Sequence, residues 1–144
     1  MSYHDDQYAV ARATPGLSPA EDDRLKARAD RLNKQEASDG IQMVQKWRAG
    51  TAERCNARIS EVQALTEQAW DVRKRLQARD ISAKQAAEQI KALRKQHEAL
   101  VNLAEGIGRE VADQDAIFAD PLGYIERLYQ SYPALQADRP SLFD

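Results

Sequence analysis

Apolar residues recur at spacings of three and four through the middle of the chain, which is the period of one face of an α-helix. The strongest run begins at Ala86 and continues to Val111, with steps of four and three in strict alternation. A heptad repeat of this length is typical of a coiled coil. A looser run of the same kind extends from Ile41 to Leu76. The pattern therefore predicts two long amphipathic helices.

A short polar segment separates the two runs and carries the signal of a helix start. Ser82 is followed three residues later by Gln85, which is the arrangement of a capping box. Two helices that are joined by so few residues lie antiparallel to each other. We therefore predict an antiparallel hairpin in which residues 41–79 pack against residues 82–118.

The hairpin has a definite register if its turn is centred near residues 80–81. Facing residues then have numbers that add up to about 162. The predicted pairs are Val72 with Ile90, Ala69 with Leu93, Val62 with Leu100, Cys55 with Ile107, and Val44 with Phe118. In this register Cys55 is expected to be a small buried apolar residue rather than a reactive thiol, since burial raises the pKa of a thiol.

A continuous helix through residues 79–82, dimerising with another copy, is the competing arrangement, because neither glycine nor proline interrupts these residues. The polar turn residues disfavour it. A two-helix hairpin buries one stripe on each helix, so apolar residues outside that stripe require a third helix or another chain. These residues are Leu65, Val101, Leu103 and Ile117.

The two ends of the chain show this periodicity weakly or not at all. We predict an extended arm over residues 1–17, then a first helix that begins at Ser18 and ends or bends at residues 38–40. Residues 120–144 are expected to form a short helix and an extended tail, which leaves residues 18–119 as the helical domain. The expected fold class is all-α: a long antiparallel coiled-coil helical hairpin with an N-terminal helix, a short C-terminal helix and extended termini.

Composition supports helices over a sheet. Charged residues make up 31% of the chain and aromatic residues 6%, whereas strands are enriched in β-branched and aromatic residues. One cysteine excludes an internal disulfide framework and a multi-cysteine zinc site. The absence of an 18-residue apolar run excludes a transmembrane helix. The acidic first residues predict that there is no signal peptide.

The sequence lacks the common enzymatic motifs, namely a Gly-rich phosphate loop, a Gly-x-Ser-x-Gly elbow and His-Glu-x-x-His. His97 lies on the predicted helical interface, where we expect it to set the register or to hydrogen-bond Thr66. The carboxylates of Asp113, Asp115 and Asp120 lack the glycines and the spacing of a calcium loop. We therefore expect no catalytic residue, metal, cofactor or small-molecule substrate, and hence no enzyme.

Charge is distributed unevenly along the chain. Residues 73–95, the hairpin tip, carry a net charge of +6, and the remaining residues carry −8. A basic tip beside an aromatic residue is suited to nucleic-acid phosphates or to an acidic face of a protein. A solvated coiled-coil surface is the alternative. The candidate partner-binding residues are Trp70, Arg73, Lys74, Arg75, Arg79, Lys84, Lys91, Arg94 and Lys95.

A second candidate surface is aromatic and lies near the C-terminus. Tyrosines on one short helix suit either an internal cap over the base of the hairpin or a protein interface. The cap is favoured, because Val44, Trp47 and Phe118 at the base need cover. The candidate partner-binding residues here are Tyr124, Tyr129, Tyr132, Leu142 and Phe143.

Antiparallel coiled-coil hairpins occur in many unrelated proteins. Small all-helical proteins of this build resemble components of bacteriophage particles or of their assembly machinery. We therefore expect a non-enzymatic structural or assembly protein that acts through coiled-coil and terminal-arm contacts, with a protein partner or by self-association, and without a membrane. The alternative is a binding module whose basic tip contacts nucleic acid or an acidic protein. The expected location is the bacterial cytoplasm, or a phage particle assembled there.

Overall fold

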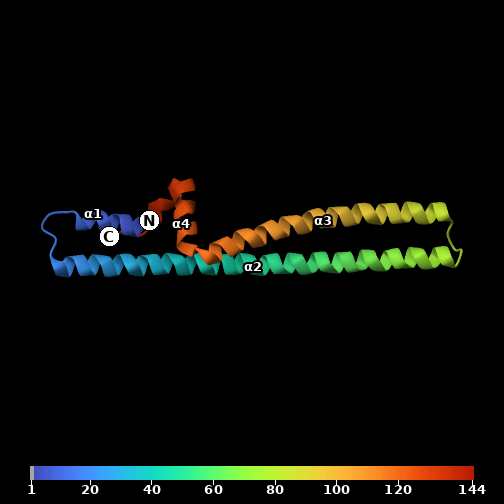
Figure 1. The fold of residues 1–144 in the computed structure, drawn as a ribbon, viewed down its shortest axis with the longest axis horizontal. Coiled ribbons are helices and arrows are strands. Elements are labelled where there is room, and N and C mark those ends of the chain that lie inside the picture. The colour runs from blue at the N-terminus through green and yellow to red at the C-terminus, as the bar shows by residue number, and fades with distance from the viewer. Residues whose placement is uncertain (1) are drawn as a thin grey trace. The chain divides into compact units, whose positions relative to one another are not determined.

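The computed structural model describes residues 2–144, which contain helices and no strand (Figure 1). The elements are α1 (Tyr3–Arg12), α2 (Pro19–Gln77), α3 (Ala83–Ala119), α4 (Pro121–Ser131) and the 3₁₀ helix η1 (Pro133–Asp138). Helices α2 and α3 pack against each other in antiparallel orientation. This arrangement confirms the all-α class, the long helical hairpin, the N-terminal helix and the short C-terminal helix.

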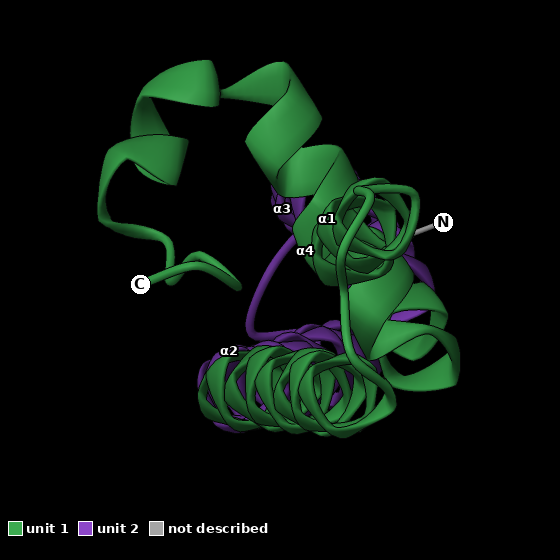
Figure 2. Ribbon diagram, turned by 90° about the vertical axis from the view of Figure 1, so that its left-hand side faces the viewer, with its two compact units in different colours: residues 1–46, 114–144 green, residues 47–113 purple. Residues whose placement is uncertain are grey.

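The chain divides into two compact units, which are coloured separately in Figure 2. Unit 1 contains the described residues up to 46 together with residues 114–144. Unit 2 contains residues 47–113, which include the turn of the hairpin. Each unit is described by itself below.

Helix α2 is one helix of 59 residues. Of the two outcomes predicted for residues 38–40, an end or a bend of the first helix, the end is therefore wrong. Glycine costs a helix about 1 kcal/mol relative to alanine, and Gly40 lies inside α2. A Cβ atom at this position would lie 3.4 Å from Cγ1 of Ile125 and 3.6 Å from the carbonyl oxygen of Pro121. A Cβ atom at this position would make ordinary van der Waals contacts with α4, so the packing of unit 1 does not require glycine here.

The prediction of an extended arm over residues 1–17 is wrong for residues 3–12, which form α1. A ten-residue helix is marginal by itself in water, and α1 is stabilised by contacts with the first part of α2. The Tyr8 hydroxyl donates a hydrogen bond to Asp22 at 2.7 Å, and the Asn33 amide donates one to Asp5 at 3.1 Å. These contacts join residues that no local pattern in the sequence connects.

The prediction of an extended tail is wrong for residues 133–138, which form η1. The residues that follow lie against α1 and α2. The backbone N–H of Leu142 donates to Oε1 of Gln7 at 2.8 Å, and the carbonyl oxygen of Ser141 accepts from Arg28 at 2.9 Å. Both ends of the described chain are therefore part of the packed structure of unit 1.

The hairpin of unit 2 has the predicted cap and the predicted register. The backbone N–H of Gln85 donates to Oγ of Ser82 at 3.1 Å, and the N–H of Ser82 donates to Oε1 of Gln85 at 2.9 Å. Hydrogen bonds also join Thr51 to Glu110 at 3.1 Å and Arg75 to Gln89 at 3.0 Å. The residue numbers of these two pairs add up to 161 and 164, which confirms the register and excludes a continuous helix.

Helix α2 ends in a Schellman motif with a strained residue. The N–H of Arg79 donates to the carbonyl of Leu76 at 3.1 Å, and the N–H of Asp80 donates to that of Arg75 at 2.9 Å. Arg79 has φ of +62°, a conformation that costs an L-residue roughly 1–2 kcal/mol and that glycine adopts freely.

We expect Arg79→Gly to raise the free energy of unfolding by about 0.5–1 kcal/mol, because glycine removes the strain at the left-handed position. Urea denaturation followed by circular dichroism measures the change. Gln77→Gly, within α2, is the control and should lower the same quantity by about 1 kcal/mol. An Arg79→Gly chain with no gain in stability would contradict the strained turn.

Candidate interaction site

Helices α2 and α3 leave an open groove along one face of unit 2. Its volume is about 300 Å³, and its walls are almost entirely apolar. Ile59 and Val101, on opposite walls, are 51% and 43% exposed. We call this feature the apolar groove. It is lined by Cys55, Arg58, Ile59, Val62, Gln63, Leu100, Val101, Ala104 and Ile107.

The same face continues toward the turn as a second hollow. Thr66 and Arg94 line it, each one heptad from Ile59 and Val101 respectively, and residues one heptad apart lie on the same face of a helix. Helix α3 also contributes His97 to this hollow. His97 and Thr66 both line this hollow, and the Thr66 hydroxyl donates its hydrogen bond to the carbonyl of Val62 rather than to His97.

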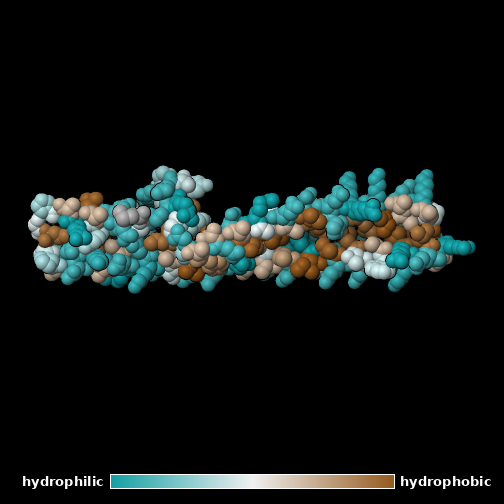
Figure 3. Space-filling model, in the orientation of Figure 1, coloured by the Kyte–Doolittle hydropathy of each residue, from teal (hydrophilic) through white to brown (hydrophobic). Residues whose placement is uncertain are grey.

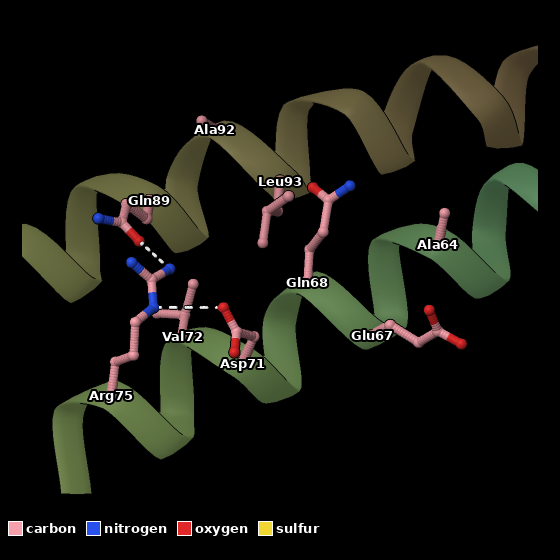
Figure 4. A pocket seen from close by; sticks show the side chains of 9 residues that line it. All are labelled: Ala64, Glu67, Gln68, Asp71, Val72, Arg75, Gln89, Ala92 and Leu93. Atoms are coloured by element: carbon pink, nitrogen blue, oxygen red, sulfur yellow. Dashed lines mark hydrogen bonds and ion pairs between the residues drawn. The ribbon is translucent and has the colours of Figure 1, made fainter. Parts of the chain in front are cut away.

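The opposite face of unit 2 is polar. Arg54 pairs with Glu110 at 2.6 Å. Their hydrogen bond lowers the pKa of the Glu110 carboxyl and raises that of the Arg54 guanidinium. Nearer the turn, Arg75 reaches both Asp71 at 3.3 Å and Gln89 at 3.0 Å (Figure 4). The two faces of the hairpin therefore differ sharply in chemistry.

Hydrophobic side chains are visible along the hairpin in Figure 3, with hydrophilic side chains on both margins. In unit 2, four apolar side chains are buried, namely Leu65, Val72, Ala86 and Leu100. A larger set is exposed by a third or more, namely Trp47, Ile59, Val62, Trp70, Leu76, Val101 and Leu103. Unit 2 thus leaves more large apolar groups in solvent than it buries.

The four apolar residues that were predicted to need a further partner divide equally. Leu65 is buried in unit 2 and Ile117 in unit 1, whereas Val101 and Leu103 are exposed. The prediction that Cys55 is buried is wrong, because its thiol is exposed. Cys55 and Ile107 do line the same groove, but this groove is open at that level.

The basic residues of the hairpin tip are arranged largely as a solvent-exposed surface. Trp70 is 54% exposed, and the guanidinium carbon of Arg73 lies 5.2 Å from its ring centroid, in cation–π geometry. Arg75 is half-buried by its contacts with Asp71 and Gln89. The remaining basic candidates are exposed, namely Lys74, Arg79, Lys84, Lys91, Arg94 and Lys95.

The aromatic candidates near the C-terminus do not form one surface. Tyr132 and Phe143 are exposed, Tyr124 and Tyr129 are half-buried, and Leu142 is buried. Burial raises the pKa of the Tyr129 hydroxyl. The ring of Tyr129 faces inward, 4.3 Å from the guanidinium carbon of Arg139. Part of this set therefore belongs to the interior of unit 1 and is not available as a surface.

Sequence reasoning missed a buried charged cluster in unit 1, which we call the Arg139 cluster. The Arg139 side chain is 2% exposed and donates to both carboxylate oxygens of Glu36, at 2.8 and 2.7 Å. It also pairs with Glu126, and its guanidinium lies between the rings of Tyr3 and Tyr129. Burial lowers the pKa of this guanidinium, but the hydrogen bonds to the two carboxylates outweigh it, so the pKa is raised.

Fully buried His4 adjoins the Arg139 cluster. Its Nε2 atom lies 3.2 Å from Oε1 of Glu36, and its ring meets the ring of Tyr3 edge to face. The cluster thus joins α1, α2, α4 and the C-terminal residues. No sequence motif predicts the Arg139 cluster, because Arg139 and Glu36 are 103 positions apart in the sequence.

Residues 2–144 contain no group of three or more His, Cys, Asp or Glu side chains that could hold a metal ion. Their helices also contain no segment that is long and apolar enough to cross a membrane. Comparison of the chain with protein-family models, curated proteins and solved structures finds no match.

Proposed function

We propose that this protein is a non-enzymatic structural or assembly protein that acts through protein–protein contacts of its hairpin. The observation that supports this function best is the apolar groove, where large side chains such as Ile59 and Val101 are half exposed. Each Å² of apolar surface that a partner covers contributes about 25 cal/mol. A contiguous apolar face beside a polar one is characteristic of an interaction surface.

The termini give less support to contacts through terminal arms. Ser2, His4 and Leu142 are buried within unit 1, so neither end is a free docking segment. Of the terminal candidates, Tyr132 and Phe143 are the most exposed. The proposed setting is a bacteriophage particle or its assembly machinery, a proposal that rests on the build of the chain alone.

We expect the apolar groove to be detectable in solution in one of two ways. Light scattering will give a mass above the 16.2 kDa of one chain, or a monomeric chain will enhance the fluorescence of anilinonaphthalene sulfonate. Ile59→Glu should abolish whichever signal is found, because it places a carboxylate in the groove. Leu103→Glu is the matched control, since Leu103 lies outside the groove and is equally exposed, at 50%.

A strictly monomeric chain that does not bind the dye would contradict the proposed function. Equal effects of Ile59→Glu and Leu103→Glu would also contradict it, because the signal would then not arise from the apolar groove. Circular dichroism of each variant establishes that the helices are retained.

The exposed hairpin tip supports a second candidate function, the binding of nucleic acid. We expect fluorescence anisotropy with a short DNA duplex to show binding that weakens with salt, with a logarithmic slope of about −0.9 for each neutralised phosphate. Reversal of exposed Arg73, Arg94 and Lys95 to Glu should abolish the binding.

The control for this experiment reverses three exposed basic residues in the first part of α2, Arg24, Lys26 and Arg31. It changes the net charge by the same amount and should leave binding by the tip intact. Equal losses in the two variants would exclude a specific role of the tip. An acidic protein as the partner would give salt-sensitive binding of the same kind without any affinity for DNA.

A further inference from the structure

We infer that the apolar groove binds a second copy of this chain, with the two hairpins antiparallel. The inference rests on the proposed function and adds the identity of the partner and its orientation. Three observations in unit 2 carry it: the size of the apolar core, the extent of the groove face, and the distribution of charge along α3.

The apolar core of unit 2 is too small for an isolated hairpin. Four apolar side chains are buried across 67 residues, and two of them, Leu65 and Leu100, are each 9% exposed. Small folds with little core are generally stabilised by disulfides, metals or oligomerisation. The single cysteine, Cys55, is free, and the described residues offer no metal-binding group. A second hairpin on the groove face would supply the missing half of a four-helix core.

The groove face offers a substantial part of the area that such an interface needs. It extends from Cys55 to Ala69 on α2, through the apolar groove and the hollow beside it. At about 1.5 Å per residue and about 10 Å per helix, the two helices present on the order of 400 Å² in projection. Accessible area exceeds projected area, and the adjoining Trp70 extends the face, toward the roughly 800 Å² per partner of a stable interface.

Charge along α3 is complementary to itself in the antiparallel direction. The half of α3 near the turn, residues 83–97, has a net charge of +3, and residues 98–113 have −3. The charged residues of the first half are Lys84, Glu88, Lys91, Arg94 and Lys95, and those of the second are Glu98, Glu105, Arg109, Glu110 and Asp113. Glu110 lies on the opposite face, where it pairs with Arg54, and without it the second half still has a net charge of −2. Two antiparallel copies of α3 would therefore place the basic half of each helix on the acidic half of the other.

The parallel arrangement is disfavoured by the same charges. Two hairpins that meet face to face by two-fold symmetry point either in the same direction or in opposite directions. In the same direction, the two hairpin tips, each with a net charge of +6, would lie side by side and repel each other. In opposite directions the tips lie at the two ends of the dimer.

The two-fold axis is expected to pass near Val101, at the level of the apolar groove. Val101 of one copy then lies beside Val101 of the other, and Arg94 lies near Gly108. Both Arg94 and Gly108 are one heptad from Val101 on the same face of α3, in opposite directions along the helix. This geometry makes specific predictions for cross-linking.

The test uses the full chain with Cys55→Ser and single new cysteines. We expect Val101→Cys to form a disulfide-linked dimer on mild oxidation. Arg94→Cys and Gly108→Cys should each remain largely unlinked alone and should cross-link when mixed. Leu103→Cys, outside the groove, is the control and should not cross-link. Sedimentation equilibrium of the wild-type chain should give twice 16.2 kDa, and Ile59→Glu should weaken the association at least tenfold.

The outcomes separate this inference from the proposed function. A wild-type chain that is monomeric at about 100 μM, but binds anilinonaphthalene sulfonate in a manner lost in Ile59→Glu, would overturn the inference and leave the proposed function standing. A dimer in which Val101→Cys does not cross-link would overturn the antiparallel geometry. A monomer that binds no dye would overturn both proposals.

Discussion

Replacement of Arg139 by methionine is expected to lower the free energy of unfolding by about 3–5 kcal/mol. The change removes one member of a buried charged cluster, and Glu36 and Glu126 are then left in the interior without their cation. Methionine retains most of the side-chain volume, so the loss reports the unpaired charges rather than a large cavity. Guanidinium denaturation followed by far-ultraviolet circular dichroism measures it.

Further variants show whether uncompensated charge causes the loss of stability in Arg139→Met. Arg54→Met removes a cation from the exposed pair with Glu110 and should have a much smaller effect, because solvent screens that pair. Glu36→Gln and Glu126→Gln, added to Arg139→Met, should recover a large part of the loss. If Arg139→Met were no more destabilising than Arg54→Met, the cluster would not stabilise unit 1.

Leu142→Ala is expected to cost about 2–4 kcal/mol, since its side chain is 2% exposed and truncation of a buried leucine leaves a cavity. The neighbouring Phe143→Ala is the matched control. Phe143 is 61% exposed, and its truncation should change the free energy of unfolding by less than about 0.5 kcal/mol. Denaturation curves of the two variants give the comparison directly.

The same pair of variants tests whether the C-terminal residues are packed against unit 1 in solution. A Leu142→Ala chain as stable as the wild type would mean that these C-terminal residues are not bound to unit 1 in solution. Hydrogen exchange at the amide of Leu142, which donates to Gln7, reports their attachment independently. Slow exchange is the expected result.

The sequence predicts those parts of the fold that local and periodic signals determine. The heptad positions of α2 and α3 specify the hairpin, and the capping box of Ser82 and Gln85 locates its turn. Together they also set the register, which the Arg75–Gln89 hydrogen bond confirms. Each of these features depends on residues that are near one another in sequence or that recur at a fixed interval.

The features that sequence reasoning missed depend on contacts between distant segments. Helix α1 has no clear apolar periodicity of its own, and contacts such as Tyr8 with Asp22 stabilise it. Gly40 lies within α2, although the residues around it are typical of a helix end. The Arg139 cluster brings together side chains from α1, α2, α4 and the C-terminal residues, and no spacing rule relates Arg139 to Glu36 or Tyr3.

The candidate site was predictable in kind and not in position. Apolar residues outside the helical interface, such as Val101, predicted that a third helix or another chain would contact the hairpin. Which side of the hairpin would be open depends on how the two helices meet, and this decides the exposure of Ile59 and Cys55. The heptad pattern places Cys55 at the interface but does not show that the groove is open there.

The position of Arg139 also has a consequence for the order of events during synthesis. Residues 47–113 make up unit 2, and they are synthesised before Arg139 is added to the chain. Protein segments generally begin to fold in the order in which they are made. Glu36 and His4 are therefore made long before the arginine that completes their cluster, so unit 1 closes only after the residues of unit 2 have been made.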